Sequence, residues 1–442
     1  MAIFIIVIEL LFLRLANTVE GGEVSDLLAI AFIMSFSLLY CGYYLKEKDS
    51  RNNYLVLGYI LRLSLLLFDL YGRYIYTLPN SGMDTEGFFR FSVQYAHGIP
   101  TKESAFVLLM GTYFRIFGIS RIYGQFLLML CSMVSMKFLL NSFDELQINN
   151  EIQIKVIRIV ALLPNFAILS SIFLRESLVT MFVSISVFFF CRWFARRKLL
   201  YYFLAMINIF IASLFHSGCV SIAMGYILVL LIYDNQNKKI NVSPSRIIIT
   251  AVLLLLFVFV FNRYGDIFFS KMTGLNTLKD ISATNEAGGS SYARYVGNSN
   301  NMLNILIFTI PRILYFIFSP FPWQWRGLSD IIAFVFSSMF YLICTIQTFN
   351  TLRTTTKNHA QVITISMILI CGLFVFAWGT SNTGTAVRHR DKLIIIQALL
   401  YGICLEIKKQ EYEANSEKTG RLFRSSGSLG GALTKHTSGV VS

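Results

Sequence analysis

The chain has 442 residues, of which 55% are hydrophobic and 14% are charged, and its formal net charge is +14. A soluble domain carries about 25% charged residues, so this composition excludes an ordinary soluble globular protein. Apolar stretches close to ~20 residues recur along the chain and predict an all-α, polytopic membrane protein. The positive charge is spread over many loops, which fits basic cytoplasmic loops and disfavours nucleic acid as a partner.

Apolar stretches of near-spanning length run from the N-terminus to residue 406. They are 2–17, 25–45, 54–77, 121–142, 155–173, 177–194, 200–216, 217–233, 247–262, 328–349, 359–378 and 391–406. Two further apolar pieces, 104–119 and 302–320, contain charged residues or proline, and we expect them to be re-entrant or interfacial. We therefore expect about twelve transmembrane helices, with re-entrant or interfacial helices, in a single domain over 1–406. The Ser/Gly-rich tail, 407–442, is expected to be cytoplasmic and disordered.

Short basic loops set the expected orientation, because such loops stay in the cytoplasm. The loops 46–53, 195–199, 234–246 and 352–358 are basic, and alternate crossings then leave both termini in the cytoplasm. The opposite, outer face carries an unusual excess of arginine. These arginines are Arg90, Arg175, Arg294, Arg326, Arg388 and Arg390. Such an excess predicts an outer site for anionic groups.

The stretch 54–77 holds Arg62, Asp69 and Arg73, and ionisable residues at membrane depth face protein or water. Asp69 and Arg73 are four residues apart and can pair directly on a helix. The three charges are either a structural ion pair that locks this helix to its neighbours or the lining of a cavity. Arg73, nearest to the outer end, is a candidate substrate-binding residue.

The first long outer loop reads "LPNSGMDTEGFFRFSVQYAHG", residues 78–98. Asp84 and Glu86 in this loop have three interpretations: a general base for a sugar hydroxyl, ligands for a divalent cation, or a helix cap with Asp84 at the N-cap. We take both as candidate catalytic residues. Arg90 lies in the aromatic, amphipathic piece that follows and is a candidate for substrate binding.

Further outer turns supply other candidates for substrate binding. Arg175 and Glu176 form a tight turn whose adjacent opposite charges need different partners, and His216 lies at the next outer turn. A lipid-phosphate contact for the arginine and a helix-end role for the histidine remain open. The segment "PRILYFIFSPFPWQWRG", residues 311–327, is either a membrane-boundary anchor or a surface for sugar stacking and phosphate binding. Its candidates are Arg312, Trp323 and Arg326.

The segment "SNTGTAVRHRDK", residues 381–392, carries the densest basic cluster. Arg388 and Arg390 point about 200° apart on a helix, so both cannot reach one lipid surface. Two guanidinium groups and the imidazole of His389 make a clamp for diphosphate, and His389 is a further candidate base. Binding of a phospholipid headgroup is the alternative.

Motifs of soluble enzymes are lacking: the sequence contains no P-loop, no HExxH and no dinucleotide-binding fingerprint in context. The seven cysteines lie in or beside apolar stretches without CxxC pairs, which points to neither a disulfide framework nor a zinc site. We expect no resident cofactor or metal, apart from the open alternative of a divalent cation at Asp84 and Glu86.

The combination of "LLLFDLYGRYIYTLPNSGMDTEGFFR", "YGQF", "FLRES", "SPFPW" and "NTGTAVRHR" resembles bacterial O-antigen or exopolysaccharide repeat-unit polymerases, the Wzy/EpsG-like group. The resemblance covers most of residues 54–406. It implies an enzyme of the bacterial cytoplasmic membrane that joins oligosaccharide units carried on undecaprenyl diphosphate at the outer face. It also implies that Arg175, Arg388 and Arg390 hold the lipid diphosphate, and that membrane lipids, a chain-length regulator and a flippase are partners.

Two alternatives remain open. Asp84-Thr85-Glu86 is similar to the acidic outer-loop motif of GT-C glycosyltransferases, which use polyprenyl-phosphate sugar donors. That motif usually follows the first span, whereas here it follows the third. The non-enzyme alternative is a lipid-linked oligosaccharide flippase, which would carry charged residues through both halves of the membrane.

Overall fold

The computed structural model describes residues 26–101, 104–234, 239–240, 243–249, 251–252, 291–292, 296, 302–354 and 359–433. The expected span at 2–17, most of the span at 247–262 and most of the loop 263–301, with Arg294, lie outside these residues. Within them the regular structure is almost entirely helical, as the apolar periodicity predicts.

The helices of the N-terminal half are, in chain order, α2 (Asp26–Lys46), α3 (Ser50–Tyr71), α4 (Met83–Ala96), α5 (Ala105–Phe117), α6 (Arg121–Glu145), α7 (Asn150–Leu162), α8 (Pro164–Ser171), α9 (Glu176–Arg196), α10 (Leu199–Phe215), η1 (Ser217–Cys219) and α11 (Val220–Ile232). Two short antiparallel strands follow, β1 (Tyr233–Asp234) and β2 (Lys239–Ile240). The C-terminal helices are α15 (Met302–Phe318), η2 (Pro322–Gln324), α16 (Leu328–Ile332), the π-helical η3 (Ala333–Ser338), α17 (Met339–Thr354), α18 (His359–Trp378), α19 (Thr383–Asp391) and α20 (Ile394–Leu433).

Short polar side chains begin several of these helices, because the first backbone N–H groups of a helix lack partners within it. The carboxylate of Asp49 accepts from the Arg51 N–H at the start of α3. Asn382 does the same for the first turn of α19. Pro164 begins α8, where its missing N–H has no cost, and bends the chain by 55° relative to α7.

Six described helices, or runs of adjoining helices, are long and apolar enough to cross a membrane, and the number rises to seven if α7 and α8 form one bent span. These helices indicate a multi-pass, all-α membrane protein. The expected count of about twelve is not confirmed. The stretch 155–173 is broken at Pro164, while α10 and the run η1–α11 are short apolar helices separated by the His216 turn. The interfacial candidate α5 has 13 residues, a length of about 20 Å, which is less than the thickness of the hydrocarbon core.

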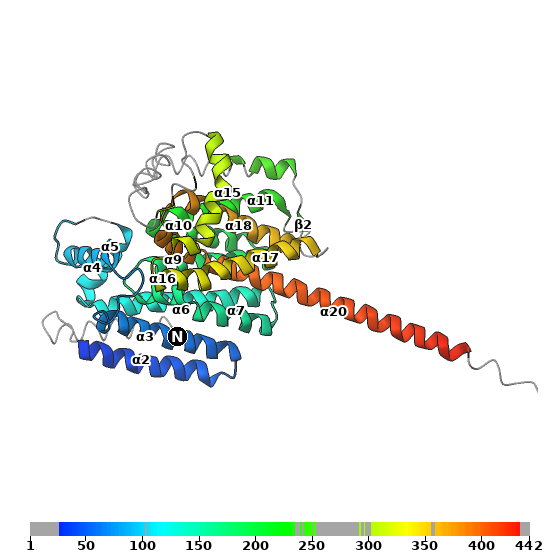
Figure 1. Cartoon of the computed structure of the whole chain (residues 1–442), viewed down its shortest axis with the longest axis horizontal. Helices are drawn as coiled ribbons and strands as arrows, with labels where there is room; N and C mark the ends of the chain where they lie inside the picture. The colour runs from blue at the N-terminus through cyan, green and yellow to red at the C-terminus, as the bar shows by residue number, and fades with distance from the viewer. Residues whose placement is uncertain are drawn as a thin grey trace, which may run out of the picture.

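The body is a bundle in which α9 lies against both α6 and α10. Ser186 of α9 ties three helices together, since its hydroxyl donates to the Ala205 carbonyl at 2.7 Å and contacts the Tyr226 hydroxyl at 2.9 Å. The first part of α20, residues 394–404, is buried in the same core. In Figure 1, α4 and α5 lie at one end of the body, and the rest of α20 projects from the other end. The helix continues to Leu433, so the expected tail, 407–442, begins inside it.

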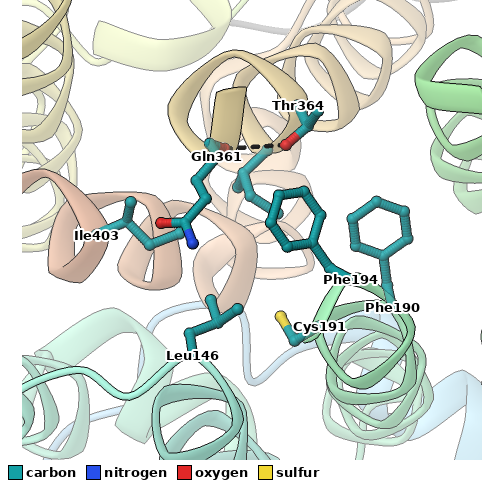
Figure 2. Close-up of a pocket in the computed structure, with 8 residues that line it drawn as sticks. Leu146, Phe190, Cys191, Phe194, Gln361, Thr364 and Ile403 are labelled. Carbon is teal, nitrogen blue, oxygen red and sulfur yellow. Dashed lines mark hydrogen bonds between the residues drawn. The ribbon is translucent and has the colours of Figure 1, made fainter. Parts of the chain in front are cut away.

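A small cavity of about 10 Å³, room for one water molecule at most, lies between α9, α18 and α20. Its lining is mainly apolar, and Figure 2 shows the Gln361 side chain near Ile403, Leu146 and Phe194. The Thr364 hydroxyl donates to the Gln361 carbonyl at 3.0 Å. Phe190 is about 21 Å along α9 from Glu176, so this cavity is separate from the polar residues at the other end of α9.

Candidate functional site

Ionisable residues from distant parts of the chain meet where α4, α9 and α19 approach one another. This charged cluster consists of Asp84, Arg175, Glu176, His216, Arg388, His389 and Lys392. Asp84 lies in the first turn of α4, Arg175 and Glu176 begin α9, and the remaining C-terminal members belong to α19 or follow it directly. His216 lies between α10 and η1. The cluster therefore forms at the end of the bundle that carries α4.

The end of α19 supplies most of the cluster because consecutive side chains leave a helix about 100° apart. Arg388 pairs with Asp84 and Glu176, His389 contacts His216, and Arg390 turns into the protein interior. Arg388 and Arg390 thus point in different directions, as their spacing on a helix predicts.

Glu176 is the buried centre of the ionic network. Only 2% of the residue is exposed, and its Oε1 accepts hydrogen bonds from Arg388 Nη2 at 2.9 Å and Arg388 Nε at 3.2 Å. Lys392 Nζ lies 3.4 Å from the same oxygen and is fully buried. Buried charges of opposite sign in this arrangement hold α9 and α19 in register.

The exposed Asp84 and the partly buried Arg175 form the more accessible side of the charged cluster. The Asp84 carboxylate accepts a hydrogen bond from Arg388 Nη1, and 61% of its side chain is exposed. Arg175 stacks over the Phe88 ring at 5.6 Å and lies within electrostatic reach of Asp84, Glu176 and Arg388. Among the described residues, the Arg175 guanidinium has no salt bridge, and its Nε has no hydrogen-bond partner. It is therefore the member of the cluster best placed to receive an external anion.

His216 and His389 form an imidazole pair beside these charges. Their Nε2 atoms are 3.2 Å apart, and His389 Nδ1 lies 2.9 Å from the Thr380 hydroxyl. Burial lowers the pKa of His389, and the positive charge of Lys392 lowers it further. The pKa of His216 is lowered for the same two reasons. Two neutral imidazoles sharing one hydrogen bond can accept or pass on a proton.

A second ionic network fastens α4 to α3 and α6. Fully buried Asp69 accepts from Gln125 Nε2 at 2.7 Å and pairs with Arg73 at 3.3 Å, as the spacing of four predicts. Both oxygens of Glu86 accept from Arg121, at 2.7 and 2.8 Å, and Arg73 also donates to this carboxylate. These hydrogen bonds, chiefly those from Arg121, lower the pKa of Glu86 to about 2. Asp84 thus retains more free carboxylate surface than Glu86.

Other candidates lie apart from the charged cluster. Arg390 is fully buried and donates to the Ile317 carbonyl and to the Ser338 hydroxyl, so a clamp with Arg388 would require these contacts to break. Arg312 is also buried, with its guanidinium 4.3 Å from the Trp378 ring.

The exposed candidates also lie outside the cluster. Trp323 is 65% exposed and stacks on Phe321 with centroids 4.7 Å apart. The exposed Arg326 uses its backbone N–H on Asp330, and the exposed Arg90 stacks on the ring of Phe91.

Sequence reasoning missed Lys392 and Arg121 as partners. Lys392 has an apolar stretch on its C-terminal side and resembles an ordinary flanking charge, and Arg121 begins a helix at a position typical of a membrane boundary. The suggestion that Asp84 is an N-cap is wrong, because Gly82 occupies that position. Asp84 lies two residues after the N-cap, in the first turn of α4, where its side chain contacts Arg388.

No group of three or more His, Cys, Asp or Glu residues with metal-binding geometry occurs in the described ranges. Asp84 and Glu86 each contact an arginine, and these contacts supply the positive charge that a cation would otherwise bring. Comparison with protein-family models, curated proteins and solved structures gives no match to this chain.

Proposed function

We propose that this protein polymerises oligosaccharide units carried on undecaprenyl diphosphate into a surface polysaccharide, at the outer face of the bacterial cytoplasmic membrane. The observation that carries the proposal is the unpaired Arg175 guanidinium beside Arg388, at an accessible edge of a membrane-embedded helix bundle. Guanidinium groups bind phosphate oxygens through paired hydrogen bonds. A lipid-linked diphosphate combines this headgroup with an apolar tail that lies in the membrane.

Arg175 and Arg388 have complementary roles in binding the donor diphosphate. Glu176 fixes the Arg388 guanidinium from the buried side, so this donor group is held in place before the substrate arrives. Arg175 brings a charge that is not neutralised by a salt bridge among the described residues. Both charges stabilise the negative charge that grows on the leaving diphosphate, which is the type of interaction that contributes most in many enzymes.

The transfer step joins two lipid-linked saccharides. The acceptor sugar hydroxyl loses its proton and attacks the anomeric carbon of the donor, and a new C–O bond forms. The bond between that carbon and the diphosphate oxygen breaks, and lipid diphosphate leaves with the electron pair. Asp84 is the first candidate to take the proton because its carboxylate is exposed, and His389 is the second.

The proposed function is tested with the purified full-length protein in liposomes that contain a lipid-diphosphate-linked oligosaccharide. We expect a ladder of chains and release of lipid diphosphate. Arg175→Gln should lower the initial rate by at least about tenfold, since it removes one charge-assisted contact of about 1.5–3 kcal/mol. Arg115→Gln is the matched control, because Arg115 is an exposed arginine of α5 outside the cluster. A wild-type protein that binds the substrate but forms no chains would contradict the proposal.

Orientation is tested separately with Met83→Cys, because Met83 is 90% exposed beside Asp84. An impermeant thiol reagent should label this cysteine in intact cells. Labelling only after the cells are broken would place the cluster on the cytoplasmic side and exclude chemistry at the outer face.

A flippase for the same lipid-linked saccharides is the second candidate, and one observation favours it. Arg62, Arg390 and Asp391 are fully or almost fully buried within the bundle, and neither Asp391 oxygen has a hydrogen-bond partner among the described residues. Charged groups inside a membrane bundle are a feature of transport paths. Movement of a fluorescent lipid-linked saccharide across the liposome bilayer, without chain growth, would favour this alternative.

A further inference from the structure

The guanidinium of Arg388 has two carboxylate partners in very different surroundings. Its Nε and Nη2 bond the buried Glu176, whereas its Nη1 bonds Asp84, whose side chain is 61% exposed. Arg388 therefore has one permanent partner and one partner in contact with solvent.

The two contacts differ in strength for a physical reason. Breaking a buried pair leaves uncompensated charges in a medium of low dielectric constant, so Glu176 stays in place. The Asp84 side of its contact is screened by water, since 61% of the Asp84 side chain is exposed, whereas only 14% of the Arg388 side chain is. This contact is therefore weaker than the pair with Glu176, and another anion can replace Asp84. Arg175 lies on the same side, within electrostatic reach of both Asp84 and Arg388. An incoming phosphate would thus meet one unpaired guanidinium and one whose carboxylate is weakly held.

Because α4 is firmly attached to its neighbours, the Asp84 carboxylate stays close to Arg388 and competes there with an incoming phosphate. The rings of Phe88 and Phe89 in α4 pack edge-on against Phe106 of α5 and against Phe173, just before α9. Glu86, two residues after Asp84, also contacts Arg121 and Arg73. The helix backbone therefore stays beside Arg388 when the Asp84 side chain rotates away. The displaced carboxylate remains next to the ligand that displaced it.

Taking the proposed function as its basis, we propose that Asp84 is an internal stand-in for the substrate phosphate. In the empty site its carboxylate occupies Arg388, and a bound diphosphate displaces it. Asp84 becomes an unpaired carboxylate, able to accept a proton, only when the diphosphate is bound. The ligand class is a lipid-linked or free diphosphate held by Arg175 and Arg388.

Binding of inorganic diphosphate to the detergent-purified full-length protein, measured by calorimetry, tests this proposal. Asp84→Asn should bind diphosphate about two- to fivefold more tightly than the wild type, because the competing carboxylate is lost. The same variant should lose chain formation in liposomes. Asp330→Asn is the control for the change in overall charge, since Asp330 bonds the Arg326 backbone and not the cluster. Its affinity should match that of the wild type.

Each outcome separates the possibilities. Weaker or unchanged binding by Asp84→Asn would overturn the proposal, because Asp84 would then help to hold the ligand or play no part. If Asp84→Asn binds diphosphate more weakly than the wild type only when Mg²⁺ is present, Asp84 binds a cation that bridges to the diphosphate, and this result also overturns the proposal. Farnesyl diphosphate at the same concentration shows whether the lipid adds affinity to the shared phosphate chemistry. Tighter binding by Asp84→Asn without chain growth in the wild type would support this inference and refute the polymerase function.

Discussion

Replacing Glu176 by Gln removes the carboxylate that Arg388 and Lys392 share. Removing one partner of a buried ion pair costs about 3–5 kcal/mol, because the remaining charge stays buried without compensation. Asp84 still contacts Arg388 in this variant, so most of the lost stability comes from the fully buried Lys392, which no longer has a carboxylate partner. We therefore expect the lower end of the range, about 3 kcal/mol, equivalent to a shift of more than about a hundredfold in the unfolding equilibrium.

The assay is denaturant-induced unfolding of the protein in mixed micelles. The double variant Glu176→Gln/Lys392→Met should recover at least half of the lost stability, because the unpaired ammonium is removed as well. Glu151→Gln is the matched control: this carboxylate is exposed and pairs with Lys409, and its loss should have no measurable effect. A loss below about 1 kcal/mol in the single variant, or no recovery in the double variant, would refute a buried charge network at Glu176.

Three other predictions concern pH and packing. The pKa of Glu86 is held at about 2, below its value of about 4.3 in an unfolded chain. The ionised carboxylate therefore contributes its full stabilisation above about pH 4.3, and this stabilisation is lost as the pH falls toward 2. Unfolding measured as a function of pH should show no such loss for Glu86→Gln, and high salt should reduce the loss in the wild type. The pKa values of His216 and His389 are lowered in the folded protein. As the pH drops, the unfolded chain therefore takes up protons first, and the stability of the wild type should decrease below about pH 6.5. The double variant His216→Gln/His389→Gln should lose less stability over this range, and an equal loss would exclude the histidine pair as the cause. A β-carbon on Gly111 would lie 2.8 Å from the Ser92 carbonyl oxygen. Gly111→Val should therefore push α5 away from α4 and lower the free energy of unfolding by about 1–3 kcal/mol, measured by thermal unfolding. A variant as stable as the wild type would contradict this close contact.

Local sequence patterns predicted part of the fold and of the charged cluster, whereas the rest depends on tertiary contacts that such patterns do not reveal. Spacing alone predicted the Asp69–Arg73 pair, because residues four apart meet on one helix. Contacts such as Asp84 with Arg388 join residues 304 positions apart, and no local rule predicts them. The expected count of about twelve spans is not confirmed by the described helices, and hydropathy does not detect the bend at Pro164. The sequence could name the charged residues, but not which of them, such as Arg175, would be left without a salt bridge in the described structure.

The last residues of α19 and the one that follows it are all ionisable, Arg388 to Lys392, and this has a consequence for biogenesis. Charged groups of this kind cost about 2.5–3.5 kcal/mol each when a segment enters the bilayer alone. The side-chain partners of Arg388, His389, Arg390 and Lys392 lie in α4, in α9, in the turn between α10 and η1, in α15 and in η3, all of which are synthesised earlier. We expect α19 to insert only after these earlier helices have assembled, so that the charged cluster forms late in assembly, together with the docking of the first part of α20.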